Sequence, residues 1–363
     1  MAPRNHKTWL KKPKVEYISS EIYHSHAIYK QEQEDIFSKV WVPVCHMSEM
    51  YNKDDYRIMT IAGEEVIVWN TGDGVEAAIN LQMKGPRGNF HLIHKGCGKK
   101  LHCEVKHGQM VWVTLDPNPK HTVEEWTAGA FDCIADAIDT EELEVFHYHK
   151  AVIDTNYKLW HDTNSEFYHD FMHYFNRVSG FNDEYFARKN IPFDNGHVNV
   201  SSFTVNYEEY DGFEDRGELS FPNLPPNQWY MVDLFPGFNF NLRGSAYRSD
   251  TVTPLGPNKV LIEFRGYGLR KDTKEERETR IKHHNSIWGP FGRNLHEDLI
   301  GVAGQGTTMR EGTEARNILH GRHENQTIHD EVGMRHYYSA WGDFMGVHPA
   351  RPLEHLPDVQ AAE

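Results

Sequence analysis

The chain has 363 residues, 39% of them hydrophobic, and a formal net charge of −15 at pH 7. This length suits one large domain or two ordinary ones, with enough apolar residues for a substantial core. The negative charge argues against nucleic acid or an anionic membrane surface as a partner. No apolar run approaches the roughly 20 residues that span a bilayer, so no membrane-embedded protein is expected.

The N-terminus and the cysteines indicate the compartment. The first residues include no apolar stretch like that of a signal peptide. Few cysteines in a large chain, irregularly spaced, suit a reducing environment better than a disulfide framework. A cytoplasmic protein is therefore expected. The cysteines are Cys45, Cys97, Cys103 and Cys133.

The first half of the chain is predicted to form a helical entry and then a small all-β unit. Residues 20–39 are compatible with a helix that has one apolar stripe and Ser20 as its cap. Short segments rich in β-branched and aromatic residues follow between 40 and 115, with glycine-containing turns between them. The expected strands are 57–61, 65–69 and 109–115. Residues 116–121 are predicted to be a loop, and 139–150 an acidic link.

The second half opens with a predicted helix at about 157–176, which carries His169 and His173. Positions i and i+4 share a helix face, so the two imidazoles could bind one metal ion. A carboxylate from elsewhere would complete a triad of two His and one Asp or Glu, which suits non-heme Fe(II) and leaves positions open for dioxygen. The best third ligand lies at 294–298, which ends at Asp298.

Two other interpretations of the histidine pair stay open. The chain has 24 His, so chance pairs are expected, and both side chains could be solvated or buried without a metal. A zinc hydrolase typically carries His-Glu-x-x-His, whereas Asp170 stands here at the position of the general base. A zinc hydrolase is therefore disfavoured.

The rest of the chain predicts a sheet covered by helices. Extended segments are expected at 197–210, 228–243 and 259–270, and a charged surface helix at 272–287. Together these elements indicate an α+β domain with an antiparallel sheet and helices packed on it. The tail, 349–363, is expected to be loosely ordered.

Three segments, in this order and spacing, resemble the α subunits of Rieske-type ring-hydroxylating oxygenases: 21–49, 156–173 and 288–298. The resemblance covers nearly the whole chain and implies two domains. One is an all-β Rieske-like domain; the other is a catalytic domain of helix-grip, START-like fold that binds mononuclear iron. The implied division is an N-terminal segment at 1–39 packed on the catalytic domain, the Rieske-like domain at 40–150, the catalytic domain at 151–348 and a flexible tail at 349–363.

The resemblance also implies roles for single residues. Glu166 occupies the position of the acidic residue that links the cluster of one subunit to the iron of its neighbour. Asp162 falls where the family usually has an asparagine near the iron. The implied iron ligands are His169, His173 and Asp298.

The chain departs from the family at the cluster. The family has Cys-x-His and then, about 15–18 residues later, Cys-x-x-His as cluster ligands. Here Gln82 and Lys84 replace the first pair, and Cys103 is followed by Lys106 in place of the second His. A lysine ammonium group cannot ligate iron without losing a proton. No [2Fe-2S] cluster is therefore expected, and the β domain would persist as a packing and interface module.

The stretch at 91–107 is also rich in His and Cys, so a zinc site there is an open alternative. Strand alternation would send His102 and Cys103 to opposite faces, which favours ordinary loop or surface residues. The sequence does not decide between these two interpretations.

The resemblance implies an oxygenase-component subunit that hydroxylates an aromatic or similar flat organic substrate with O2 at mononuclear Fe(II). Electrons would come from a Rieske-competent α-type subunit in a trimer-based or hetero-hexameric assembly, or from a cluster-bearing reductase or ferredoxin. The alternative is a non-catalytic α-like scaffold or regulatory subunit, against which the intact triad argues. Aromatic residues in the predicted strands suit a flat apolar substrate. Arg243 could hold a substrate carboxylate, unless it is a satisfied surface or sheet-edge arginine.

Overall fold

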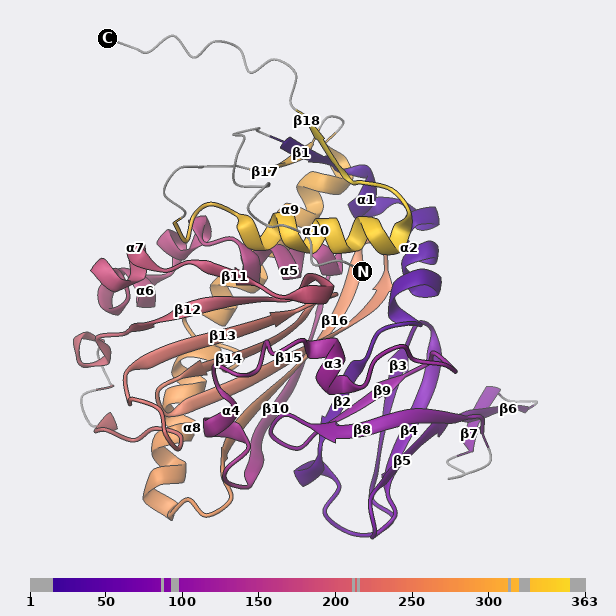
Figure 1. The fold of residues 1–363 in the computed structure, drawn as a ribbon, viewed down its shortest axis with the longest axis horizontal. Helices are drawn as coiled ribbons and strands as arrows, with labels where there is room; N and C mark the ends of the chain where they lie inside the picture. The colour runs from indigo at the N-terminus through magenta and orange to yellow at the C-terminus, as the bar shows by residue number, and fades with distance from the viewer. Residues whose placement is uncertain are drawn as a thin grey trace.

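The computed structural model describes residues 16–85, 88–92, 98–210, 213, 216–312, 315–319 and 327–352, with the backbone alone described for 81–85 and 88–92. Within these ranges the chain forms two β-rich units side by side, and helices cover one face of the larger unit (Figure 1). The α+β architecture that the sequence predicts is confirmed.

The smaller unit is a six-stranded antiparallel sheet in the order β2-β9-β8-β5-β4-β3. It contains the three strands expected there, because their β-branched and aromatic side chains fill its core around the fully buried Trp112. A separate hairpin joins β6 (Leu81–Gly85) to β7 (Gly88–Leu92). The strands of the sheet are β2 (Val42–His46), β3 (Tyr56–Ile61), β4 (Glu64–Asn70), β5 (Val75–Ile79), β8 (Lys100–Lys106) and β9 (Met110–Thr114).

The larger unit is a seven-stranded antiparallel sheet in the order β10-β16-β15-β14-β13-β12-β11. Its strands include the three extended segments that the sequence predicts. They are β10 (Leu143–Ile153), β11 (Asn190–Pro192), β12 (Val198–Thr204), β13 (Gln228–Leu234), β14 (Phe238–Arg243), β15 (Ala246–Gly256) and β16 (Lys259–Leu269).

One boundary differs from the sequence-based division. Residues 139–150 were expected to be an acidic link, but β10 occupies most of this range and pairs with β16 along its length. The acidic residues that suggested a link stand at its start, whereas the strand itself is rich in β-branched and aromatic residues. The strand therefore belongs to the larger sheet, and the change of unit falls before Leu143.

The two faces of the larger sheet have different neighbours, because side chains alternate along each strand. One face packs on the smaller unit: Trp112 of β9 stacks on Phe240 of β14, and Arg265 of β16 pairs with Glu49 at 2.7 Å. The other face, called here the helix-covered face, lies under α5 and α8. Ser165 at the end of α5 donates a hydrogen bond to Asp233 of β13 at 2.6 Å.

The helices include the charged surface helix that the sequence predicts, now α8. The N-terminal helical entry is divided, and its cap is Ser25 rather than Ser20, whose side chain makes no capping hydrogen bond. The helices of four or more residues are α1 (Glu21–His24), α2 (His26–Glu32), η2 (Gln33–Phe37), α3 (Val123–Thr127), α4 (Ala135–Ile138), α5 (Tyr157–Ser165), η4 (Tyr168–Met172), α6 (Tyr174–Ser179), α7 (Asp183–Ala187), α8 (Lys274–Trp288), α9 (Leu295–Glu311) and α10 (Val332–Met345).

The two ends of the described chain meet on the larger unit. A three-stranded sheet joins β1 (Glu16–Ser19) to β17 (Arg316–Leu319) and β18 (Ala350–Pro352). The expectation of a loosely ordered tail is thus wrong for 350–352, and 353–363 lie outside the described residues. The buried Lys158 of α5 pairs with Glu32 of α2 at 2.5 Å, which attaches the N-terminal segment to the larger unit.

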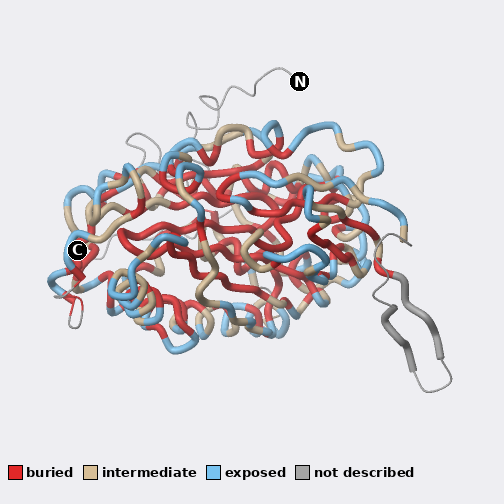
Figure 2. The backbone as a smooth tube through the Cα atoms, turned by 90° about the horizontal axis from the view of Figure 1, so that it is seen from below, coloured by how far each residue is buried: buried red, intermediate tan, exposed pale blue. Residues whose placement is uncertain are grey.

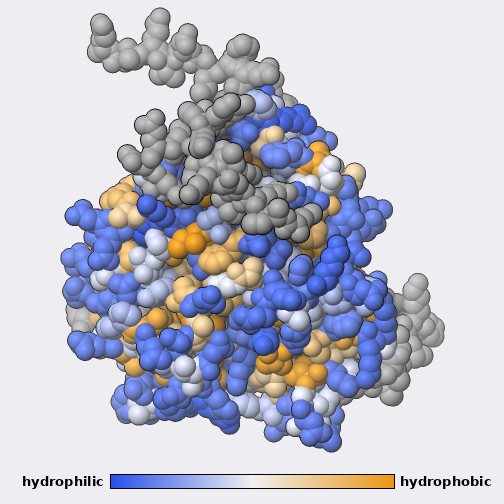
Figure 3. Space-filling model, in the orientation of Figure 1, coloured by the Kyte–Doolittle hydropathy of each residue, from blue (hydrophilic) through white to orange (hydrophobic). Residues whose placement is uncertain are grey.

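Buried backbone runs through the middle of the molecule and exposed backbone lies at its periphery (Figure 2). The surface seen in Figure 3 is largely hydrophilic, with hydrophobic residues in small separate groups. Among the described helices, none combines the length and apolar character that crossing a bilayer requires.

Candidate metal centre

The histidine-bearing segment is not the continuous helix that the sequence predicts. Helix α5 ends at Ser165, Glu166 has an extended backbone, and the 3-10 helix η4 follows. The Glu166 carboxylate accepts hydrogen bonds from the backbone N–H groups of Tyr168 at 2.7 Å and His169 at 3.3 Å. These bonds cap the new turn and compete with continuation of α5. The argument from one shared helix face is therefore wrong.

The two histidines nevertheless converge with Asp298. His169 lies in η4, His173 stands between η4 and α6, and Asp298 lies in the first turn of α9. Oδ1 of Asp298 is 3.5 Å from Nε2 of His169 and 3.0 Å from Nε2 of His173. Gly306 lets α9 approach the start of α5, since a Cβ there would lie 2.7 Å from the carbonyl oxygen of Asp154. We call His169, His173 and Asp298 the triad.

The other ring nitrogen of each histidine is held by a glutamate. Nδ1 of His169 lies 2.5 Å from Oε1 of Glu166, and Nδ1 of His173 lies 2.8 Å from Oε2 of Glu297. Carboxylates on the far nitrogen fix the tautomer and orientation of metal-binding histidines. Both Nε2 atoms are thereby turned toward Asp298.

Asp170 is a second carboxylate near the triad, and one of its oxygens falls within 4.8 Å of a ligand atom of each histidine. Its oxygens are already engaged: Oδ1 accepts from Asn176 at 3.1 Å, and Oδ2 accepts from Tyr185 at 2.8 Å. Oδ1 of Asp298 is buried, and the contacts described for it are those with the two Nε2 atoms. The geometry therefore favours Asp298 over Asp170. It also leaves Asp170 poorly placed as the general base of a zinc hydrolase.

The histidines and carboxylates of the site stabilise each other's charged forms. Burial opposes ionisation of His169, but the carboxylates of Glu166, Asp298 and Asp170 raise its pKa to about 10. Burial likewise opposes ionisation of His173, and Asp298 raises its pKa. Burial alone would raise the pKa of the Asp298 carboxylate, but the two histidines outweigh this effect, and the pKa is lowered. A metal that binds here must displace the protons of both imidazoles.

The donor set fits mononuclear non-heme iron. Two imidazole nitrogens and one carboxylate oxygen form the facial arrangement typical of Fe(II) oxygenases, which leaves coordination positions free. A buried carboxylate is costly unless hydrogen bonds or a cation satisfy it. When bound, the iron would supply the activation of dioxygen.

Asp162 lies in a different network. Its carboxylate accepts hydrogen bonds from Tyr338 at 2.9 Å and Asn317 at 2.9 Å, and the Tyr23 hydroxyl lies 3.4 Å away. Burial raises the pKa of Asp162 to about 7. None of its described contacts reaches the triad, so Asp162 joins α1, α5, β17 and α10, and its proposed role near the iron stays a prediction.

Arg243 is neither a surface nor a sheet-edge residue. It ends β14, an interior strand, and is 7% exposed. Its guanidinium carbon lies 5.1 Å from the ring of Trp229, 5.4 Å from that of Trp288 and 5.7 Å from that of Phe175. Burial lowers its pKa. Its position on the helix-covered face leaves a role in substrate binding open.

The positions that replace the cluster ligands lie in the smaller unit. Gln82 and Lys84 are on β6 opposite His91 and Asn89, where only the backbone is described. Cys103, on β8, is partly buried, and its thiol lies 3.3 Å from the carbonyl oxygen of Val75. Lys106 is exposed at the end of the same strand.

The possible zinc ligands of this unit point in different directions. His102 lies 3.1 Å from the carbonyl oxygen of Pro117, whereas the buried His107 bonds Thr127 at 3.0 Å and stacks on Phe131. His94 and Cys97 lie outside the described residues, and the question of zinc in this stretch stays open. Within the described ranges, the one place where three potential ligand atoms meet is in the larger unit.

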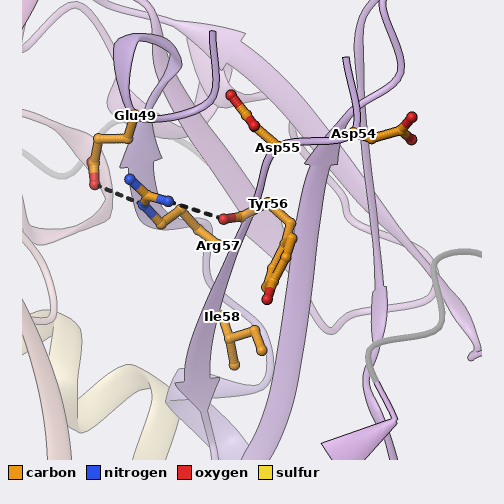
Figure 4. A pocket seen from close by; sticks show the side chains of 6 residues that line it. All are labelled: Glu49, Asp54, Asp55, Tyr56, Arg57 and Ile58. Carbon is orange, nitrogen blue, oxygen red and sulfur yellow. Dashed lines mark hydrogen bonds and ion pairs between the residues drawn. The ribbon is translucent and has the colours of Figure 1, made fainter. Parts of the chain in front are cut away.

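A separate open hollow of about 580 Å³ lies on the outer edge of the smaller unit (Figure 4). It is formed by Glu49 and by the start of β3 with the turn before it. Arg57 projects toward Glu49, 3.4 Å away, and lies at the hollow's wall. The hollow contains none of the triad, so it is not the metal centre.

Sequence reasoning missed two residues of the site. Glu297, the neighbour of Asp298, is given no role in the sequence analysis, whereas it holds the far nitrogen of His173. Arg248 of β15 was not considered, although the alternation of a strand that carries Arg248 and Asp250 could have placed both on one face.

Comparisons with known proteins identify the family of the chain. A family model described as the ring hydroxylating alpha subunit (catalytic domain) matches residues 140–347. The chain is 54% identical over 403 aligned positions to the methanesulfonate monooxygenase hydroxylase subunit alpha of Methylosulfonomonas methylovora, with 97% of each chain covered. It is 34% identical to the 2-aminobenzenesulfonate 2,3-dioxygenase subunit alpha of Alcaligenes sp, with 91% of this chain and 93% of the relative covered.

Among solved structures, naphthalene 1,2-dioxygenase from Rhodococcus sp. bound to indole superposes with a TM-score of 0.72 at 16% identity, over 91% of this chain and 94% of that chain. This likeness shows a shared fold. The family match and the two relatives also show the family to which the chain belongs. The chain therefore belongs to the ring-hydroxylating α subunits of Rieske-type oxygenases, oxidoreductases that incorporate molecular oxygen.

Proposed function

We propose that this chain binds one Fe(II) at the triad and inserts one oxygen atom of O2 into a C–H bond of a small organosulfonate. The other oxygen atom leaves as water, and two electrons and two protons are supplied from outside the chain. The observation that carries the proposal is the convergence of His169, His173 and Asp298, with distances of 3.5 and 3.0 Å to Oδ1 of Asp298.

Glu166 and Glu297 hold the two imidazoles in place. The Glu166 side chain is 15% exposed and contacts Nδ1 of His169, so it reaches the surface beside the triad. This position supports its role as the link through which electrons from a partner reach the iron. The chain's own residues thus orient the metal ligands and offer a short path to the surface.

Electrons come, in this proposal, from a cluster-bearing partner, because three of the four cluster-ligand positions are Gln82, Lys84 and Lys106. The alignment with the methanesulfonate monooxygenase subunit spans 403 positions, more than the 363 residues of this chain. At least 40 positions of that alignment (403 − 363) therefore have no residue in this chain. A shortened cluster region would account for both observations. The partner is a Rieske-competent α-type subunit in a mixed oligomer, or a cluster-bearing reductase or ferredoxin.

The substrate class is proposed from the relatives and from the buried arginine. The relatives at 54% and 34% identity are named for methanesulfonate and 2-aminobenzenesulfonate, which share a sulfonate group. Arg243 offers a buried guanidinium that suits such an anion. An aromatic sulfonate is the second candidate, since Trp229, Trp288 and Phe175 surround this guanidinium.

The experiment is an iron analysis and a turnover assay of the chain with its co-purified partners. Wild-type protein should carry one iron per chain and release product from methanesulfonate, and His169→Ala should lose both. His296→Ala is the control, because His296 is exposed on α9 two residues from Asp298. Undiminished turnover by His169→Ala would show instead a scaffold for a competent partner. A [2Fe-2S] spectrum from the isolated chain would overturn the assignment of the electron source.

A further inference from the structure

We infer that Arg243 and Arg248, which both lie near the ring of Trp288, form the binding site for a monoanionic headgroup of the substrate. This inference rests on the proposed function for the reaction that follows binding. It adds a second arginine, a hydrogen-bond donor and a charge requirement that the family assignment does not contain.

Strand pairing places both arginines on the helix-covered face. Arg248 of β15 stands opposite Asn241 of β14, and Arg243 stands opposite Ala246. Paired residues share a face, and so do residues two apart on a strand, so Arg243 and Arg248 are diagonal neighbours. Such neighbours lie within reach of long side chains. Burial, and after it the charge of Arg248, contributes to the lowered pKa of Arg243.

The two guanidinium groups are buried without enough acceptors. Among the described residues, Arg243 has no hydrogen bond or ion pair, and its Nε is fully buried. Arg248 is 3% exposed and donates one hydrogen bond to Asp250 at 2.8 Å, while its Nε and Nη1 have no partner. Burying a cation is costly unless an anion or several acceptors meet it. The site is therefore short of one anion.

Both guanidinium groups lie near the indole ring of Trp288. The guanidinium carbon of Arg248 lies 4.9 Å from its ring and that of Arg243 lies 5.4 Å from it. The indole N–H of Trp288 is itself buried and has no acceptor. An anion between these groups would receive hydrogen bonds from both arginines and from the indole.

Arg188 in the same unit is a useful comparison. It is also buried among aromatic rings, and its Nη1 and Nη2 also lack a hydrogen-bond partner among the described residues. However, it forms an ion pair with Asp170 at 3.6 Å and donates from Nε to the carbonyl oxygen of Tyr185 at 3.2 Å. Aromatic packing alone therefore does not explain Arg243, which has the rings and lacks the carboxylate. A bound ligand can supply what Asp170 supplies to Arg188.

The charges select the ligand class. Burial raises the pKa of Asp250 to about 7, so above this pH the Arg248–Asp250 pair is neutral and Arg243 leaves one positive charge. One net charge suits a sulfonate or carboxylate, and disfavours both a dianion and a neutral hydrocarbon. Arg243 lies 5.7 Å from the ring of Phe175, which is two residues from His173, so the pair of arginines lies near the triad. The headgroup would anchor here and direct the substrate's carbon end toward the metal.

The test is titration calorimetry on the full-length chain with Fe(II) added, using methanesulfonate, acetate and the neutral dimethyl sulfone as probes. Methanesulfonate should bind at least about 10-fold more tightly than dimethyl sulfone, because only the anion completes the site. Equal binding of both would overturn the inference without any substitution. Acetate tests how specific the site is. Weaker binding of acetate than of methanesulfonate would indicate a sulfonate-specific site, and equal binding would indicate a site for any monoanion. If neither anion bound, the inference would be overturned.

Arg243→Gln and Arg248→Gln should each weaken methanesulfonate binding by about 10- to 100-fold. Arg243→Lys should recover part of the loss, and the exposed Arg270→Gln should match the wild type in affinity. Melting temperature and iron content are measured for every variant, so that a misfolded protein is recognised. Unchanged affinity in both Gln variants would refute the anion site. If those variants kept their iron and turnover, the proposed function would hold although the anion site would be refuted. If methanesulfonate binding depended on the arginines but the protein bound no iron, the anion site would hold and the proposed function would be refuted.

Discussion

The smaller β unit and the helix-covered face of the larger sheet differ in how their buried polar groups are paired. In the smaller unit, His46 bonds the carbonyl oxygen of Gly108 at 2.7 Å, and Glu49 pairs with Arg265 of the larger sheet at 2.7 Å. On the helix-covered face, Nε of Arg243 and both Nε and Nη1 of Arg248 are buried without a hydrogen-bond partner among the described residues. The face toward the smaller unit also has such an atom, Nη1 of Arg265, but Arg265 is paired with a carboxylate there, whereas Arg243 is not. A buried cation without a carboxylate points to a ligand on the helix-covered face.

The largest expected effect separates the two carboxylates beside the histidines. Asp298→Asn should reduce Fe(II) affinity by more than about 100-fold, because the substitution removes the anionic ligand. Asp170→Asn should keep the iron but lower the free energy of unfolding by about 1–3 kcal/mol, since Tyr185 and Arg188 lose their carboxylate partner. Iron titration and urea unfolding measure the two quantities. Loss of iron in Asp170→Asn with retention in Asp298→Asn would reverse the assignment.

A smaller effect is expected at the glutamates behind the ligands. Glu297→Gln should weaken Fe(II) binding by about 10- to 100-fold, because Gln cannot supply the charge that orients His173. Glu166→Gln should do the same through His169 and should also slow electron transfer from the partner. Metal titration and single-turnover rates distinguish the two. Equal single-turnover rates in both variants would count against the linking role of Glu166.

The contact between the two units should matter for stability and not for the metal. Arg265→Met removes the closer of the two cations of Glu49, leaving Arg57 at 3.4 Å, and should lower the free energy of unfolding by about 1–3 kcal/mol. The iron content per folded chain should stay at the wild-type value, because Arg265 lies on the face away from the triad. Loss of iron in a folded Arg265→Met protein would mean that the smaller unit shapes the metal centre.

The smallest expected effect is a pH dependence within the smaller unit. Burial lowers the pKa of His46 to about 4, below the roughly 6.5 of the unfolded chain. The unfolded chain thus binds more protons between these values, so stability should fall as the pH drops from about 6.5 toward 4. His46→Gln, which can still donate to Gly108, should show a shallower fall, by about 2 kcal/mol at pH 5. Parallel pH curves for the two proteins would show that His46 is not responsible.

Much of the fold follows from local patterns, whereas the site depends on distant contacts. The strands β3, β4, β9 and β16 and the helix α8 were predictable, because β-branched runs and charged helical stretches signal themselves locally. The break at Glu166 was not, since it depends on a side chain capping the next turn. The triad was indicated by resemblance. Arg248 could be recognised only once the register set it beside Arg243 and Trp288.

The most direct test of the metal centre is a crystal structure of the iron-loaded protein with anomalous scattering measured at the iron edge. The account predicts one iron peak per chain, between Nε2 of His169, Nε2 of His173 and the Asp298 carboxylate. No peak at that point, or a two-iron peak beside Cys103 in the smaller unit, would contradict it.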